Sequence, residues 1–171
     1  MSTTKGAQPE KTVAVESCLG SSELVVALVG CGKLKADKPG LRAKDLYRGL
    51  PFRLAFKHAK ATADDVHILS ALHGLVDPYA MLAPYDFSMV QIPPSQHVVW
   101  GKRILNDLKA AYPMRRLRIV FYAGQQYVRP IMRAITDEDR YWTFEDPLKG
   151  LDLFERIRWF KQHDPDLKPP F

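Results

Sequence analysis

Apolar residues along the chain form short blocks that alternate with segments of helical periodicity. Three blocks rich in branched apolar residues end at glycine or small polar residues, which predicts buried β-strands over residues 24–29, 66–70 and 117–122. Apolar positions at helical spacing predict four helices: one from Pro51, one capped by Ser95 with Val98 inward, one after Gly124 and one over 152–163 with Leu153, Ile157 and Phe160 inward. Pro130 lies in the third helix and predicts a late start or a kink there.

Strands that alternate with helices are typical of parallel pairing. We therefore expect an α/β fold: a single three-layer domain over residues 23–163, with a mainly parallel central sheet flanked by helices. Residues 1–22 are polar and predict a flexible tail, in which residues 12–16 could form a short edge strand. Residues 164–171 contain three prolines and predict an extended C-terminal tail.

Composition excludes several classes of protein. The longest apolar run, residues 24–29, is far shorter than the roughly 20 residues of a membrane helix, and the N-terminus has no apolar leader. We therefore expect a cytoplasmic protein without membrane contact. Cys18 and Cys31 are the only cysteines, which is too few for a disulfide scaffold, and they lack metal-ligand spacing. No metal, cofactor or obligate protein partner is expected.

The charge balance favours a polyanionic partner. The chain has 25 Lys and Arg against 19 Asp and Glu, for a net charge of +6 and a pI near 9.3. Between residues 101 and 118 we expect a basic face opposed only by Asp107, formed by Lys102, Arg103, Lys109, Arg115, Arg116 and Arg118. Such a face can bind a phosphate backbone, or it can simply keep the protein soluble.

Candidate chemistry follows each predicted strand, where α/β proteins bind ligands. After the first strand, residues 30–35 read Gly-Cys-Gly-Lys-Leu-Lys, in which the glycines allow close backbone approach and Lys33 and Lys35 can contact phosphate. This spacing is not that of a P-loop. Cys31, between glycines and beside lysines, could have thiolate character and act as a nucleophile, or it could be a small buried residue at a strand end.

A second polar block precedes the Pro51 helix. Asp45 could orient a lysine or a sugar hydroxyl, or it could merely pair with Lys44 or Arg48. Tyr47 could stack on a base, and Arg48 could hold a phosphate.

The second strand leads into Ser70-Ala-Leu-His73-Gly74, and residues 83–89 follow a little later. We expect His73 to donate a proton or a hydrogen bond, because histidine titrates near neutral pH. Asp86 is the carboxylate that we expect to be catalytic, with Asp45 or Asp77 as alternatives, although Asp77 precedes a proline as turn residues do. Tyr85 could stack on a flipped base.

After the third strand, Gly124 allows a helix N-terminus to approach an anionic ligand, and Gln125 can read a base edge. Tyr122 and Tyr127 are expected to pack more than to stack. Residues 146–150 form a loop that could close over the same end of the sheet.

Four of these blocks, in order between Leu24 and Met89, resemble a bacterial and phage family: G-C-G-K-L-K, D-L-Y-R-G-L-P-F, I-L-S-A-L-H-G-L-V-D-P and A-P-Y-D-F-S-M. That family opens with S-C-[SG]-K-x-K and is similar to the YaaA group of peroxide-stress, DNA-binding proteins. It is distantly similar to uracil-DNA-glycosylase-like and transglycosylase-associated domains. The resemblance implies handling of bases in phage defence or DNA hypermodification.

Two positions depart from the YaaA pattern: His73 replaces a tyrosine, and Asp86 replaces an arginine. Both place a proton-handling group there, which favours an enzyme. The resulting hypothesis is a DNA glycosylase that removes a modified base, with binding residues Cys31, Lys33, Lys35, Tyr47, Arg48, Ser70, Gly74, Tyr85, Gly124, Gln125, Arg115, Arg116 and Arg118. The alternatives are a non-catalytic YaaA-like DNA-binding protein and a hydrolase of free nucleotides or nucleosides.

Overall fold

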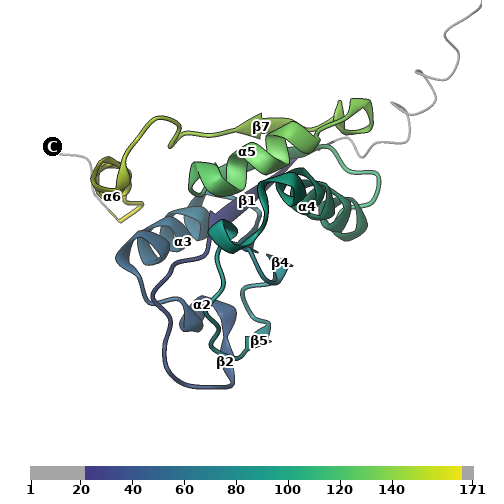
Figure 1. Cartoon of the computed structure of the whole chain (residues 1–171). Coiled ribbons are helices and arrows are strands. Elements are labelled where there is room, and N and C mark those ends of the chain that lie inside the picture. The colour runs from purple at the N-terminus through teal and green to yellow at the C-terminus, as the bar shows by residue number, and fades with distance from the viewer. Residues whose placement is uncertain (1–21, 167–171) are drawn as a thin grey trace, which may run out of the picture.

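The computed structural model describes residues 22–166 (Figure 1). It contains a five-stranded sheet in the order β4-β3-β1-β6-β7. All neighbours pair in parallel except β3 and β4, which are antiparallel. The strands are β1 (Leu24–Gly30), β3 (Asp65–Ser70), β4 (Gly74–Val76), β6 (Leu117–Tyr122) and β7 (Thr143–Glu145). The expected strand at residues 12–16 lies outside the described residues.

Helices cover both faces of the sheet, so the predicted three-layer α/β fold is confirmed. One face packs against α4 (His97–Ala111) and α5 (Gln125–Ala134), and the other against α3 (Leu50–Thr62) and α6 (Leu153–Gln162) (Figure 1). Successive side chains of β1 point to opposite faces of the sheet. Val26 and Leu28 belong to the hydrophobic core under α4 and α5, and Ala27 and Val29 belong to the core under α3 and α6. This double burial explains why the predicted strands are almost continuously apolar.

The three predicted strands are confirmed to within one residue, whereas the short strands were missed. β4 and β7 have too few residues to show a period. β4 returns directly from β3, and Gly74 takes a φ of 76° at its start, a conformation that glycine adopts without strain. A separate two-stranded sheet joins β2 (Leu41–Arg42) to β5 (Met81–Leu82), beside the one-turn helix α2 (Ala43–Leu46).

The helix predictions need three corrections. Ser95 does not cap α4, because it lies within a 3₁₀ turn (Pro94–Gln96) and the helix begins at His97; Val98 is exposed. Of the late start or kink expected from Pro130, the late start is wrong: α5 begins at Gln125, since burial of its apolar face outweighs one lost backbone hydrogen bond. Leu153 is exposed, whereas Phe160 is buried as expected.

The remaining short elements are the 3₁₀ turns Met89–Gln91 and Asp137–Asp139. Among residues 22–166, no helix has both the length and the apolar character needed to cross a membrane.

The stability of the domain is expected to fall as the pH drops from 7.5 to 5.5. Burial lowers the pKa of His67 from its ordinary value of 6.5, against the opposing pull of Asp65 and Asp77, and the pKa values of His58 and His73 are lowered too. The folded state therefore binds fewer protons than the unfolded chain below pH 6.5. The stability that the folded state gains by keeping these histidines neutral is complete above pH 6.5. It is lost as the pH falls towards their folded-state pKa values.

Urea unfolding at several pH values measures this effect. The variant His67→Gln keeps a hydrogen-bonding group near Tyr112, whose hydroxyl lies 2.6 Å from His67 Nε2, and it removes one titrating group. Its free energy of unfolding should fall less steeply over this pH range than that of the wild type. An unchanged slope would contradict the assignment to His67.

Candidate functional site

The site lies at the carboxyl ends of the strands, where the chain order reverses across the sheet. β1 has β3 on one side and β6 on the other, and the chains leaving β1 and β6 diverge to helices on opposite faces. Such a switch point opens a crevice between the two loops. Gly30 permits their close approach, because a Cβ there would lie 3.1 Å from Cβ of Ala123.

Three tyrosines, a serine and a cysteine form a hydrogen-bonded tyrosine cluster at this edge: Cys31, Tyr47, Ser70, Tyr85 and Tyr127. Tyr85 Oη lies 2.7 Å from both Tyr47 Oη and Ser70 Oγ. Cys31 Sγ lies 3.2 Å from Tyr127 Oη. The cluster thus joins the ends of β1 and β3 to α5 and to the segment that carries Asp86.

The hydroxyls of the tyrosine cluster are neutral at physiological pH. Burial raises the pKa of Tyr85 to about 12, and burial is also the main cause that raises the pKa values of Tyr47 and Tyr127. Lys35 Nζ lies 4.3 Å from the centroid of the Tyr85 ring, a cation–π distance. The cluster therefore presents protonated donors beside a cation.

A cavity of about 420 Å³, here the Asp86 cavity, adjoins the tyrosine cluster. It is lined by Cys31, Gly32, Lys33, Lys35, Asp86, Phe87, Ser88, Val90, Gln91, Gln126 and Tyr127. The structure therefore brings the expected carboxylate Asp86 together with both expected lysines and with Cys31. Carboxylate, ammonium, amide and aromatic groups line one space of the size that small ligands occupy.

His73 is not among the residues that line the Asp86 cavity. Its ring packs edge-on against Tyr85, with the centroids 4.9 Å apart, and its backbone N–H donates to Ser70 Oγ at 3.1 Å. Burial, and then Arg103, lowers the pKa of His73, so its imidazole is neutral at pH 7. Arg103 also donates to the His73 carbonyl at 3.0 Å and lies against Gly74. These contacts favour a positioning role for His73.

The two alternative carboxylates have local partners. Asp45 lies on α2 and forms an ion pair with Lys44 at 3.0 Å. Asp77 Oδ1 accepts from the backbone N–H of Tyr79 at 2.6 Å, as turn residues do. Of the three candidates, Asp86 is the one that lines the cavity.

Arg48 is exposed near the crevice. It contributes a backbone hydrogen bond to Leu34 at 2.9 Å and does not line the Asp86 cavity.

The rotation of α5 about its axis directs Gln126, and not Gln125, into the Asp86 cavity. Gly124 is the N-cap of this helix, and Gln125 Nε2 donates to Asp146 Oδ2 at 2.6 Å, away from the cavity. Gln126 lines the cavity instead. Sequence reasoning missed Gln126, together with Phe87, Ser88 and Gln91. The signal for Gln126 was its place beside Gln125, but only the helix rotation distinguishes the two.

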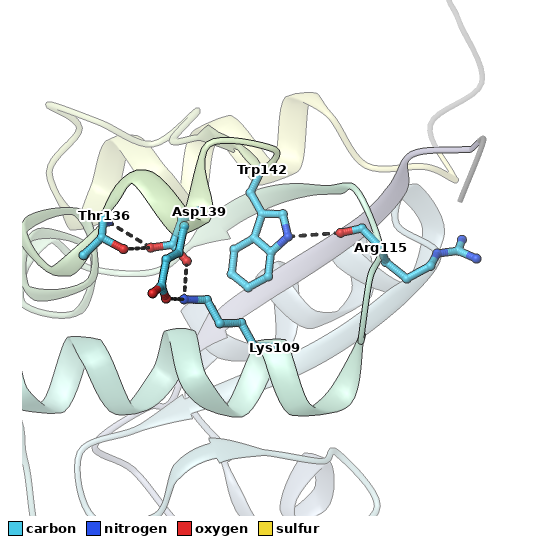
Figure 2. A network of polar contacts seen from close by, with 6 residues as sticks. Lys109, Arg115, Thr136, Asp139 and Trp142 are labelled. Carbon is cyan, nitrogen blue, oxygen red and sulfur yellow. Dashed lines mark hydrogen bonds and ion pairs between the residues drawn. The ribbon is translucent and has the colours of Figure 1, made fainter. Parts of the chain in front are cut away.

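The expected basic face lies partly at the opposite edge of the sheet. Arg115 and Arg116 precede β6, so they lie near its amino end, and the Arg115 carbonyl accepts from Trp142 Nε1 at 3.1 Å (Figure 2). Lys109 forms an ion pair with the buried Asp139 at 2.9 Å (Figure 2). It forms a second ion pair with Glu138 at 3.2 Å.

The expectation that only Asp107 opposes this face is therefore wrong. Arg118 forms a two-point contact with Glu145, with distances of 2.7 and 3.0 Å, while Asp107 pairs with Arg103. The opposing acids come from residues 138–145, which are distant in sequence and meet the face through tertiary folding.

Within residues 22–166, no group of three or more His, Cys, Asp or Glu side chains is placed to hold a metal ion. Searches of curated proteins and of solved structures found no match. A protein-family model matches residues 26–162, which include the loops that form the site. The chain therefore belongs to the family of unknown function DUF6884.

Proposed function

We propose that the protein is an N-glycosidase that acts on a nucleotide in DNA. The observation that carries the proposal is the Asp86 cavity, in which one carboxylate shares the lining with Lys33, Lys35 and the amides of Gln91 and Gln126. Each group matches one part of a nucleotide: the carboxylate the sugar, the lysines the phosphates, and the amides the base edge.

The reaction needs charge stabilisation at the sugar and a donor for the base. Cleavage passes through a sugar cation resembling an oxocarbenium ion, which a carboxylate stabilises. In the proposed step the bond from C1′ to the base nitrogen breaks, the base takes the bonding electrons, and water adds to C1′ on the face where Asp86 can accept its proton. The departing base accepts hydrogen bonds from the protonated Tyr127 hydroxyl and the Gln126 amide and takes its proton from solvent, and Asp86 afterwards returns the proton of the attacking water to solvent, so that the products are the free base and a sugar with a hydroxyl at C1′.

The tyrosine cluster supports this assignment because it anchors the segment that carries Asp86. Tyr85 directly precedes Asp86, and its hydroxyl is held by the buried residues Tyr47 and Ser70. A carboxylate that is positioned before the substrate arrives needs little reorganisation during the reaction. His73 packs against Tyr85 and contributes to the same positioning.

The proposal includes access to a base inside DNA. An enzyme that acts on the glycosidic bond extrudes the nucleotide from the stack, and aromatic side chains can hold the flipped base. Phe87 and Tyr127 are the aromatic residues that line the cavity. We also propose a cytoplasmic location, which the free thiol of Cys31 and a DNA substrate support.

Incubation of the purified protein with duplex DNA tests the proposal directly. The duplexes carry canonical or modified bases and no metal is added. The expected result is free base, detected by mass spectrometry, with alkali-labile abasic sites in equal amount. Binding to every duplex without base release would instead favour the DNA-binding reading.

The placement of the arginines favours a second candidate, a hydrolase of free nucleotides. Arg115 and Arg116 lie near the amino edge of the sheet, while the cavity lies at the carboxyl edge. A free nucleotide would need only Lys33 and Lys35 for its phosphate.

The double variant Arg115→Gln/Arg116→Gln separates the two candidates. For a DNA substrate we expect weaker binding to a long duplex and a salt dependence that is shallower by about one unit of slope per lost phosphate contact. Turnover of a free nucleotide should not change. The matched control is Arg53→Gln/Lys60→Gln, which removes two exposed charges from α3. Equal affinity of both double variants for duplex DNA, with free nucleotide as the better substrate, would support the second candidate.

A further inference from the structure

A second cavity borders the Asp86 cavity across the loop that follows β1. It has a volume of about 400 Å³ and is here called the apolar cavity. The two cavities share five lining residues: Cys31, Gly32, Lys33, Gln126 and Tyr127. Because five residues line both spaces, the two cavities are direct neighbours.

The apolar cavity differs from its neighbour in chemistry. Its apolar lining comes from the end of β6, from the segments that follow β1, β6 and β7, and from α3 and α6: Leu34, Pro51, Phe52, Ala55, Tyr122, Ala123, Leu148, Leu153 and Phe160. Among these, Phe52, Ala55, Leu148 and Phe160 are buried members of the core on the α3 and α6 side. Among the described residues that line this cavity there is no carboxylate, and its two charged groups are Lys33, which also lines the Asp86 cavity, and Arg156. Arg156 Nε donates to the Leu151 carbonyl at 2.9 Å, and the rest of the lining is mostly apolar, so the cavity suits an apolar group without positive charge.

Exposed apolar side chains gather at the rim of the same cavity. Leu34 is 63% exposed and Leu153 is 55% exposed, and both line it. Single exposed leucines are common on protein surfaces, but two that line one cavity indicate a ligand that covers them.

We propose that the base removed by this protein carries a bulky apolar substituent, which occupies the apolar cavity while the base itself lies in the Asp86 cavity. This inference rests on the proposed N-glycosidase function and adds the substrate class. An unmodified base would leave the apolar cavity unfilled and Leu153 exposed. An alkyl, alkenyl or aryl group on the base would fill the apolar cavity and bury Leu153.

Two short single-stranded oligonucleotides test the inference, identical except that the central adenine of one carries an N⁶-benzyl group. Each buried CH₂ contributes about fourfold in affinity, so after the cost of ordering the group we expect about 30- to 300-fold tighter binding of the benzylated strand. The affinities are measured by fluorescence anisotropy, and base release from both strands is measured in parallel.

A pair of neighbouring substitutions localises the effect. Leu153→Asp places a charge in the lining of the apolar cavity, and we expect it to reduce the preference for the benzylated strand at least tenfold. Phe154→Asp is the matched control: this residue is 76% exposed, does not line the cavity, and should leave the preference intact. Both positions lie in the first turn of α6, where aspartate is favourable, so both variants should fold.

The outcomes distinguish this inference from the proposed function. Equal binding of the two strands, with base release from either, overturns the inference and leaves the N-glycosidase function in place. Absence of binding for both strands overturns the inference, whereas the N-glycosidase function is judged separately by base release from the panel of duplexes. A preference that Leu153→Asp and Phe154→Asp reduce equally also overturns the inference, because the benzyl group would then lie outside the apolar cavity.

Discussion

The variant Asp86→Asn is expected to lose base release by about 10²- to 10⁴-fold while binding DNA with nearly unchanged affinity. The amide keeps the size of the side chain but removes the negative charge that would stabilise the sugar cation and the base that would accept a proton from water. Asp86 lines the cavity together with Lys33 and Lys35, so substrate binding through the phosphates should persist. Single-turnover kinetics and anisotropy measure the two effects separately.

Two further aspartates serve as comparisons. Asp37→Asn makes the same chemical change at an exposed residue of the loop after β1 and should leave base release intact. Asp45→Asn tests the alternative carboxylate, whose ion pair with Lys44 indicates a structural contact. If Asp45→Asn removes activity while Asp86→Asn keeps it, the catalytic assignment is wrong.

The variant Gly101→Ala is expected to destabilise the domain by about 3 kcal/mol or more. Gly101 is buried where α4 crosses α5, and a Cβ there would overlap the backbone carbonyl of Pro130. Backbone atoms cannot move aside as the end of a flexible side chain can, so the two helices would have to separate. The expected fall in Tm is about 6–12 °C for a domain of this size.

Calorimetry and urea unfolding of Gly101→Ala and of Gly49→Ala check this prediction. At Gly49, which precedes α3, a Cβ would meet only Cδ of Pro51 at 3.8 Å, an ordinary contact. Gly49→Ala should therefore change the free energy of unfolding by less than about 1 kcal/mol. A similar decrease in the free energy of unfolding for both variants would show that helix packing at Gly101 is looser than the structure indicates.

The predictions for Asp86 and Gly101 are linked through helix α5. Gly101 allows α4 and α5 to pack closely on one face of the sheet, and α5 in turn carries Gln126 and Tyr127 into the Asp86 cavity. A substitution at Gly101 that leaves the protein folded should therefore also weaken base release, because α5 would shift with respect to the loop after β1. Loss of stability without loss of activity would show that the site tolerates this shift.

The tyrosine cluster illustrates what sequence reasoning could and could not find. Ser70 and Cys31 follow predicted strands, and the parallel arrangement brings such positions to one edge, so their meeting was predictable. Tyr47 and Tyr85 come from segments without regular periodicity. Their mutual hydrogen bond depends on how residues 41–47 and 79–86 fold against each other through β2 and β5, and no local pattern specifies that.

The ion-pair partners of the basic residues likewise could not be found from the local sequence. The run from residue 101 to 118 is basic in sequence, but Lys109 and Arg118 find their carboxylate partners on the turn and strand at residues 137–145. Ion pairs of this kind join residues distant in the chain, so a count of neighbouring acids underestimates them. The position of Arg115 and Arg116 at the amino edge of the sheet likewise follows from strand direction.

By itself, the sequence determined the fold class, the three long strands, the helices between them and the edge of the sheet at which Cys31, Lys33 and Ser70 lie. Burial of apolar blocks and the parallel direction of the strands are sufficient for these features. Only the tertiary structure decided that Gln126 lines the cavity in place of Gln125, that His73 supports Tyr85, and that an apolar cavity borders the Asp86 cavity. Each of these depends on helix rotation or on contacts between distant segments, for which the local sequence carries no signal.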